Sequence, residues 1–330
     1  MTAFGWQSVA ADHCLAPRRR QSFRSSPYLQ QVGCYVGQQC PFDGASELIK
    51  RLMGIDLSDK QIERICHYHG QLFDGELYVD VIEGADQTCY YVEMDGSMVL
   101  TRQQQQQSGG WKEIKLARLF KAEDVLTIKQ RTLMLIRHSD YVAHLGGHER
   151  FTQQMAARIG TKHNLIALGD GAQRIGEFWS EHYPSAVQIL DLYHVLEKLG
   201  MWARLVGGDS ERCRDWMALQ QSRLESDGVA EVIESIEQER CLGESRKQQQ
   251  CLLTYLTNNR SRMHYGTYRE AGYLIGSGAI ESANREVIRQ RLKLSGQRWT
   301  PQGLQQVANL RVAYKSGREA LIRQHFQKAA

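Results

Sequence analysis

Residues 165–195 read LIALGDGAQRIGEFWSEHYPSAVQILDLYHV, and this stretch decides the fold that we expect for the chain. The run LIALGD is short and apolar, which is typical of a buried strand, and a helix with an apolar face follows it. That face carries Ile175, Phe178 and Trp179, and Pro184 ends the helix. The run AVQILDLYHV then predicts a second strand. A strand, a helix and another strand favour a right-handed crossover between parallel strands.

The segment ahead of this stretch predicts antiparallel strands. CYYVEMDGSMVL (89–100) and WKEIKLARLF (111–120) alternate in hydrophobicity, and a polar tip with the glutamine run 103–107 separates them. TLMLIRHSDYVAHLG (132–146) predicts one further strand. A hairpin followed by parallel strands predicts an α/β fold with a mixed sheet flanked by helices.

Helical patterns predict the remaining parts of the chain. Residues 48–53 and 62–66 carry apolar stripes on either side of Gly54, and Ser58 can cap the second helix. This helix-turn-helix pattern is typical both of DNA-binding modules and of small packed helical domains, so both readings stay open. The expected parts are a basic arm or linker (1–30), a helical region (31–75), the first part of the core (76–194), a helical insertion (195–272) and the C-terminal core helices (273–330).

Three acidic residues are the candidate catalytic and metal-binding groups. Asp95 and Asp170 each follow an apolar run and precede a glycine, so we expect both at strand ends beside tight turns. Glu281, in GSGAIESANR, opens an amphipathic helix. Carboxylate oxygens suit Mg²⁺ or Mn²⁺, and two such ions roughly 3.5 to 4 Å apart support phosphodiester chemistry. The alternative is that Asp before Gly marks only a turn.

Further candidates lie near these acids in the sequence. Asp191 and His194 form a supporting pair at the end of the second strand. Arg285, Arg289 and Lys293 follow Glu281 at steps of four, which places them on one face of an α-helix. A cationic strip of this kind suits DNA phosphates, whereas an exposed helix with a Glu–Arg pair is the competing interpretation.

The charge distribution points to a polyanionic partner more than the total charge does. The net charge is +4, and basic residues gather near the start and in the last fifth of the chain. The candidate DNA-binding residues there are Arg18, Arg19, Arg20, Arg298 and Trp299. Trp299 has two interpretations, stacking on a nucleobase or packing in the core, and packing is favoured.

The composition also limits the location of the protein. No run of about 18 apolar residues occurs and no secretory signal opens the chain, so we expect a cytoplasmic protein with no membrane partner. The eight cysteines include no Cys-x-x-Cys pair, which favours reduced thiols. A zinc remnant formed by His13, Cys14, Cys34 and Cys40 is a weaker alternative, because the spacing matches no usual zinc motif.

Five blocks occur in order: DGSMV, GWKEIKLARLF, LGDGAQRIGEFW, ILDLYHVLEKL and GSGAIESANREVIRQRLKLSGQRWT. In this order they resemble bacterial insertion-sequence transposases of the ISKra group, within the Mutator-like DDE superfamily. The similarity runs from about Ser26 to Gly317. The resemblance implies a ribonuclease-H-like core with a helical insertion before the last catalytic acid.

The resemblance also implies roles for individual residues. Asp95, Asp170 and Glu281 take the places of the three catalytic acids, and Asp191 with His194 matches the family's Cys-or-Asp, x, x, His motif. The implied activity is DNA cleavage by water and strand transfer by a 3′-hydroxyl, without a covalent enzyme intermediate. The implied partners are terminal inverted repeats and target double-stranded DNA, in at least a dimeric synaptic complex at the bacterial nucleoid.

Relatives usually carry a Cys-rich segment ahead of the helical N-terminal region, and the start of this chain suggests a shortened reading frame. Two rival functions remain, a catalytically inactive DNA-binding descendant and a metal-dependent nuclease on the same fold. A Rossmann-type dehydrogenase is disfavoured, because no Gly-x-Gly-x-x-Gly follows any predicted strand.

Overall fold

The computed structural model describes residues 23, 25–76, 88–103, 109–128, 133–161, 164–208, 210–276 and 278–328. The candidate DNA-binding residues Arg18, Arg19 and Arg20, as well as His13 and Cys14, lie outside the described residues. No helix among the described residues is both long and apolar enough to span a bilayer. Contacts divide the chain into two units. Unit 1 comprises Met1–Gly84, Gly96–Thr161 and Ser282–Ala330, and unit 2 comprises Ala85–Asp95 and Lys162–Glu281.

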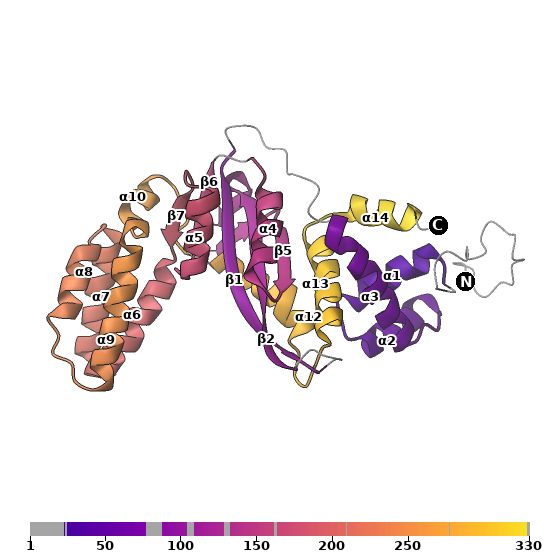
Figure 1. Cartoon of the computed structure of the whole chain (residues 1–330), viewed down its shortest axis with the longest axis horizontal. Coiled ribbons are helices and arrows are strands. Elements are labelled where there is room, and N and C mark those ends of the chain that lie inside the picture. Colours follow the sequence, from indigo (N-terminus) through magenta and orange to yellow (C-terminus); the bar gives the residue numbers. More distant parts are fainter. Residues whose placement is uncertain are drawn as a thin grey trace, which may run out of the picture. The chain divides into compact units, whose positions relative to one another are not determined.

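A mixed five-stranded sheet confirms the expected α/β class (Figure 1). Its strand order is β5-β2-β1-β6-β7. The strands are β1 (Tyr90–Thr101), β2 (Gly110–Lys121), β5 (Asp140–Leu145), β6 (Leu165–Gly169) and β7 (Val187–Leu190). β2 pairs antiparallel with β5, whereas β6 runs parallel to both β1 and β7. The helix α5 (Gln173–His182) connects β6 to β7, as the apolar pattern of this stretch predicts.

The prediction of a strand end and a turn at Asp95 is wrong. β1 continues without a break through Asp95 and Gly96 to Thr101. Gly96 gives room for the neighbouring strand instead of turning the chain, because a Cβ atom there would lie 2.3 Å from the Glu113 carboxylate of β2. Residues 90–95 of β1 belong to unit 2, and residues 96–101 belong to unit 1.

Two other predicted strands also differ from the structure. The segment 132–146 forms β4 (Leu133–Ile136) and β5 rather than one strand, and β4 pairs with β3 (Val125–Ile128) in a separate two-stranded sheet. A short 3₁₀ turn, η1 (Ala122–Asp124), precedes β3. The strand predicted for AVQILDLYHV ends at Leu190, and the helix α6 (Leu192–Gly207) begins directly after Asp191.

The helices of unit 1 are arranged around the buried helix α13 (Pro301–Lys315). The predicted start of α13 is confirmed, since the Thr300 hydroxyl accepts a hydrogen bond from the Gly303 N–H at 3.1 Å and Pro301 is the first residue. The other helices of this unit are α1 (Pro27–Gly37), α2 (Phe42–Met53), α3 (Asp59–Glu76), α4 (His148–Ile159) and α14 (Glu319–Lys328). α1 begins at Pro27, inside the predicted arm, because Ser26 caps it and Pro27 fixes its first turn.

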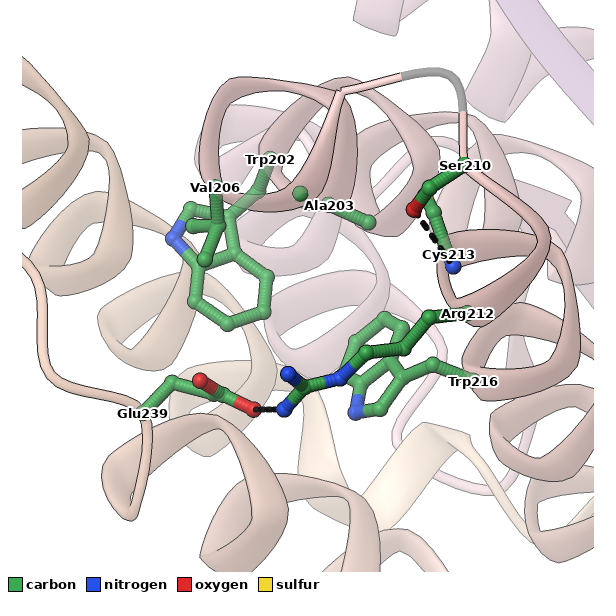
Figure 2. A pocket seen from close by; sticks show the side chains of 9 residues that line it. Trp202, Ala203, Val206, Ser210, Arg212, Cys213, Trp216 and Glu239 are labelled. Carbon is green, nitrogen blue, oxygen red and sulfur yellow. Dashed lines mark hydrogen bonds and ion pairs between the residues drawn. The ribbon is translucent and has the colours of Figure 1, made fainter.

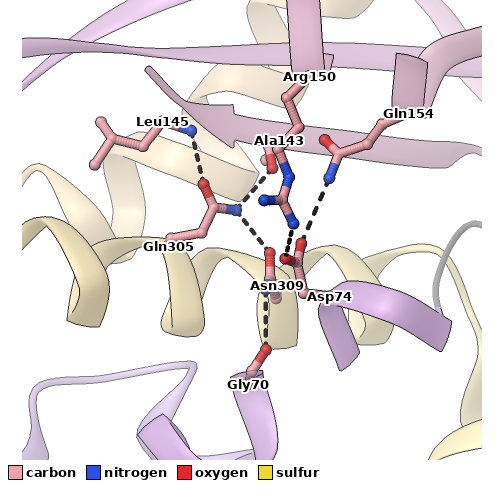
Figure 3. Close-up of polar contacts among 8 residues, drawn as sticks. All are labelled: Gly70, Asp74, Ala143, Leu145, Arg150, Gln154, Gln305 and Asn309. Atoms are coloured by element: carbon pink, nitrogen blue, oxygen red, sulfur yellow. Dashed lines mark hydrogen bonds and ion pairs between the residues drawn. The ribbon is translucent and has the colours of Figure 1, made fainter. Parts of the chain in front are cut away.

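A layer of hydrogen-bonded polar side chains joins α13 to its neighbours (Figure 3). Gln305 donates to the Ala143 carbonyl oxygen of β5 at 3.0 Å and accepts from the Leu145 N–H at 2.7 Å. Asn309 donates to the Gly70 carbonyl oxygen of α3 at 2.9 Å. A Cβ atom at Gly70 would lie only 2.1 Å from the Gln306 carbonyl oxygen, so the two backbones are in close contact. The second helix of the predicted helix-turn-helix is therefore a core helix along this face.

Unit 2 carries a group of helices between β7 and Glu281. The helices α6, α7 (Glu211–Glu225), α8 (Val229–Glu237) and α9 (Glu244–Asn259) contact one another as a bundle (Figure 1). A 3₁₀ turn η2 (Arg260–Arg262) and the short helix α10 (Tyr265–Glu270) follow. No strand occurs among the described residues of this stretch.

The helix that contains Glu281 is not a uniform α-helix. It starts as α11 (Gly278–Ala283), continues as the π-helical turn η3 (Asn284–Arg289) and ends as α12 (Gln290–Leu292). The buried Arg311 guanidinium donates to the carbonyl oxygens of Glu286 and Val287, within η3. Because π-helical bonding displaces carbonyl groups from the regular ladder, Arg311 supplies partners where the sequence inserts this turn.

Candidate active site at the carboxyl edge of the sheet

The strand register brings three aspartates to the same level at one edge of the sheet. In the parallel pairs, Glu93 of β1 lies beside Leu168 of β6, and Gly169 of β6 lies beside Leu190 of β7. The same registers carried past these pairs place Asp95 level with Asp170, and Asp170 level with Asp191. Paired residues of parallel strands point to one face, so we expect these three carboxylates to share a face at the carboxyl ends of β6 and β7. All three belong to unit 2.

Local backbone geometry fixes the position of Asp170. Gly171 has φ +85°, a left-handed conformation that glycine adopts readily, and the chain turns there into α5. The Asp170 carboxylate accepts a hydrogen bond from the Ala172 N–H at 3.0 Å, which forms an Asx turn. Asp170 remains exposed at this turn. The predicted strand end with a tight turn is therefore confirmed at Asp170.

Asp191 caps the helix α6. Its carboxylate accepts from the Tyr193 N–H at 2.8 Å, and its own N–H donates to the Gly169 carbonyl oxygen at 2.8 Å. Asp191 is 4% exposed, so the side chain is largely enclosed beside the strand end. His194 lies in the first turn of α6, with Nδ1 3.6 Å from a Glu197 carboxylate oxygen. The supporting pair is thus divided between a capping carboxylate and an imidazole beside Glu197.

Tyr255 of α9 joins the acid edge, although no local sequence pattern indicates this position. Its hydroxyl donates to the Asp170 carbonyl oxygen at 2.8 Å. Burial raises the pKa of the Tyr255 phenol, and the negative charges of Asp170 and Asp191 raise it further. Both carboxylates therefore act electrostatically on one phenol. Tyr255 stays neutral and ties the insertion to the Asp170 backbone.

Glu93 is a second residue that sequence reasoning missed. It is fully buried (0% exposed) and lies on the face that carries Asp95, two residues earlier along β1. The alternating pattern of β1 could have indicated this acid, because a Glu on a buried strand face is rare. The apolar run around it masked the signal.

The segment ahead of α11 approaches the same face of the sheet. The Leu274 N–H donates to the Tyr91 hydroxyl at 3.0 Å, and the Ile275 carbonyl oxygen accepts from the Leu192 N–H at 2.9 Å. Tyr91 shares a face of β1 with Asp95. Glu281 follows in α11 and is exposed. The structure therefore brings the chain before Glu281 beside β1 and the start of α6.

The acids do not form a closed ligand set. Within the part of the chain that the structure describes, no group of three or more His, Cys, Asp or Glu side chains is arranged to hold a metal ion. Asp95, Asp170 and Asp191 share the edge, whereas no contact joins Glu281 to them in the described geometry. The donor chemistry nevertheless fits a hard cation, since these residues offer carboxylate oxygens.

A polar cavity of about 820 Å³ opens beside the acid edge. It lies between α5 and α9, and Gly171, Gln173, Tyr255, Asn259 and Arg262 are among its lining residues. A smaller cavity of about 200 Å³ lies within the helix bundle (Figure 2). Trp202, Trp216 and the Arg212–Glu239 ion pair, 3.9 Å apart, surround it. The larger cavity is the one next to Asp170.

The cationic residues after Glu281 are exposed, but Trp299 is not. Arg285, Arg289, Lys293 and Arg298 all face solvent. Steps of four hold one face only in a regular α-helix, and the π-helical turn η3 rotates this strip away from the predicted line.

Trp299, predicted among the DNA-binding residues, is 6% exposed and is corrected to a core residue. It packs on the Arg291 guanidinium at 4.9 Å, and its indole N–H donates to the Leu292 carbonyl oxygen at 3.0 Å. These contacts satisfy both the ring and its single donor, so packing is the correct interpretation.

The seven cysteines within the described residues are free thiols, as expected of reduced cysteines. Burial raises the pKa of Cys34, which makes this thiol a poor metal ligand at neutral pH. Cys40 donates instead to the Val36 carbonyl oxygen at 3.5 Å. These two residues therefore provide no sign of a zinc site.

The family model of an uncharacterised protein family, UPF0236, matches residues 15–327, so the chain belongs to this family. No curated protein matches the chain.

Proposed function

We propose that this chain is a Mg²⁺-dependent DNA transposase with a ribonuclease-H-like core. One observation carries the proposal: the parallel registers of β1 with β6 and of β6 with β7, continued past the last pairs, bring Asp95, Asp170 and Asp191 level with one another at the carboxyl edge of the sheet. In open α/β sheets, ligands bind at this edge. The order of the five sequence blocks and their resemblance to ISKra-group transposases supply the reaction class.

Asp95, Asp170 and Glu281 would hold the metal ions, with Asp191 beside them. Bound Mg²⁺ would activate an oxygen nucleophile and neutralise the leaving oxygen of the phosphodiester. Glu281 is exposed on α11 and would complete the ligand set of the aspartates. Strand pairing fixes the backbone of Asp95 and Asp170.

The protein groups around the acids have separate tasks. Tyr255 and the Asx turn hold the backbone of Asp170, and the Asp191 cap holds the start of α6. Arg285 and Arg289 are exposed cations that would contact DNA phosphates. Terminal inverted repeats and target DNA are the proposed substrates, and joining two ends requires at least a dimer.

Asp170→Asn tests the assignment. We expect this variant to bind DNA from the flanks of the reading frame as tightly as the wild type, and to lose Mg²⁺-dependent nicking by more than about 100-fold, which exceeds the cost of losing an outer supporting partner. Asp215→Asn is the matched control, because Asp215 is an exposed acid of α7 in the same unit. Equal nicking by all three proteins would contradict the proposal.

The same assay separates the two rivals. A catalytically inactive descendant would bind the flanking DNA but never nick it in Mg²⁺ or Mn²⁺. A nuclease would cleave DNA or hybrid duplexes without terminal repeats and would form no strand-transfer product. The proposed transposase joins a cleaved 3′-end to a second DNA molecule.

A further inference from the structure

Trp111 is a large aromatic side chain that the fold leaves on the surface. It is the second residue of β2 and is 60% exposed, whereas Trp299 in the same unit is 6% exposed. Burying a tryptophan is strongly favourable, so the core gains nothing from holding this ring in water. An exposed aromatic side chain of this size is a candidate contact residue.

One cation lies over this ring, and a backbone contact brings two arginines into the neighbouring segments. The Lys293 ammonium lies 6.0 Å from the Trp111 ring centroid, within the range of a cation–π contact. The Arg102 N–H donates to the Trp299 carbonyl oxygen at 2.7 Å, which brings Arg102 beside the residue that follows Arg298.

The same end of the hairpin holds the ring and the arginines together. The Thr101 hydroxyl donates to the Gly110 carbonyl oxygen at 2.9 Å, directly before Trp111. Arg102, Trp111, Lys293 and Arg298 are all exposed and lie on segments of unit 1 that these contacts join, and we call this set of residues the Trp111 patch.

The chemistry of the patch fits a nucleic acid with unpaired bases. Three cations match phosphate groups, and a flat indole matches the face of a nucleobase. In a duplex the base faces are stacked on one another, so a surface tryptophan has no base face to contact. An unpaired strand offers phosphates and open base faces together.

We propose that the Trp111 patch binds single-stranded DNA, with Trp111 stacked on one base and Lys293, Arg102 and Arg298 on the backbone. The inference rests on the proposed function, because strand cleavage and transfer are what would present an unpaired strand to this protein. It adds that the DNA end is locally unpaired when bound, and that Trp111 favours this unpaired state over a duplex.

Binding of a labelled 20-residue oligothymidylate to the full chain, measured by fluorescence anisotropy in EDTA, tests the patch. We expect Trp111→Ala to weaken this binding by about tenfold, since stacking on one base contributes an effect of that order. Trp111→Phe should retain most of the affinity. Affinity for a 20-base-pair duplex should change by less than about threefold, because the duplex offers no base face.

Tyr28→Ala is the control, since Tyr28 is 61% exposed on α1 in the same unit. It should leave oligothymidylate affinity unchanged. Lys293→Ala and Arg298→Ala should each reduce the slope of log affinity against log salt by about 0.7, the effect of one lost phosphate contact on a single strand.

The proposal is overturned if the wild type fails to bind oligothymidylate, or if Trp111→Ala weakens single-strand and duplex binding equally. A Trp111→Ala effect no larger than that of Tyr28→Ala also overturns it. The absence of metal keeps the test separate from catalysis. If the wild type does not nick DNA but Trp111→Ala still weakens single-strand binding selectively, only the proposed function is contradicted.

Discussion

Arg311 in unit 1 and Asp170 in unit 2 are both charged, but their surroundings differ completely. Arg311 is 1% exposed and donates to the carbonyl oxygens of Gln38, Glu286 and Val287. Asp170 is exposed, and its carboxylate accepts from one backbone N–H. The guanidinium N–H groups of Arg311 bond to backbone carbonyl oxygens and so link parts of the structure. The Asp170 carboxylate keeps room for a ligand.

Burial and bonding therefore separate structural charges from charges that can bind a ligand in this chain. Burial and, to a smaller extent, the charge of Arg291 lower the pKa of Arg311 to about 10, so Arg311 remains a cation at neutral pH. A buried cation of this kind is retained for the groups that it bonds.

The largest expected effect on stability follows from Arg311→Met. This change leaves three carbonyl oxygens, two of them in buried hydrogen bonds, without their donor, and we expect the free energy of unfolding to fall by about 4 kcal/mol. Urea unfolding followed by circular dichroism measures it. Arg289→Met, an exposed change in the adjacent π-helical turn, should stay within about 0.5 kcal/mol. Equal losses in both variants would remove the contrast between buried and exposed cations.

Gly70→Ala should lower the free energy of unfolding by about 3 kcal/mol. The added methyl group would meet the Gln306 carbonyl oxygen at 2.1 Å, so α3 and α13 must separate. Thermal or urea unfolding measures the loss. Gly44→Ala in α2 is the matched control, because a Cβ atom there meets nothing within 4 Å. It should stabilise the helix by about 0.5 to 1 kcal/mol. A stable Gly70→Ala variant would contradict the close approach of the two backbones.

A smaller effect comes from His69, which is buried between α1, α3 and α14. Its ring nitrogens lie 2.8 Å from His325 Nε2 and 2.9 Å from Gln30 Oε1. Burial, and then the charge of His325, lower the pKa of His69 to about 3. The unfolded chain takes up a proton near pH 6.5 that the folded His69 excludes, so stability falls as the pH falls between about 6.5 and 3.

From pH 6.5 to 5 the wild type should therefore lose about 2 kcal/mol through this residue. His69→Gln, which removes the titrating ring, should lose correspondingly less over the same interval. His138→Gln serves as the control at an exposed histidine. Urea unfolding at the two pH values provides the measurement, and parallel pH profiles for wild type and His69→Gln would refute the linkage.

The local sequence pattern predicted those helices and strands whose hydrophobic spacing and end residues agree with their place in the fold. β6, α5 and the start of α13 follow from an apolar run, an amphipathic spacing and a Thr–Pro start. The turn expected at Asp95 failed because β1 has partners on both sides, and pairing overrides a two-residue turn preference. The apolar run continues past the end of β7, so hydrophobicity alone does not locate that end. Asp191 is a typical helix N-cap residue and could have indicated it.

The candidate site was predictable only in part. Each aspartate follows a strand-like run, so an acid at the end of a strand could be expected for Asp170. The level of Asp95 beside Asp170 depends on strand register, which one sequence does not encode locally. Tyr255 reaches Asp170 from a helix 85 positions further along the chain, and Trp299 packs on Phe42, which is distant in sequence, as well as on the nearby Arg291. Tertiary packing decides both positions.

The central claim is that Asp170 belongs to a metal-binding edge, and Mn²⁺ binding measured by electron paramagnetic resonance tests it most directly. The wild type should bind Mn²⁺ without DNA, and Asp170→Asn should weaken that binding by at least about tenfold. Asp215→Asn should bind as the wild type does. Equal Mn²⁺ affinity in the wild type and Asp170→Asn would contradict the account.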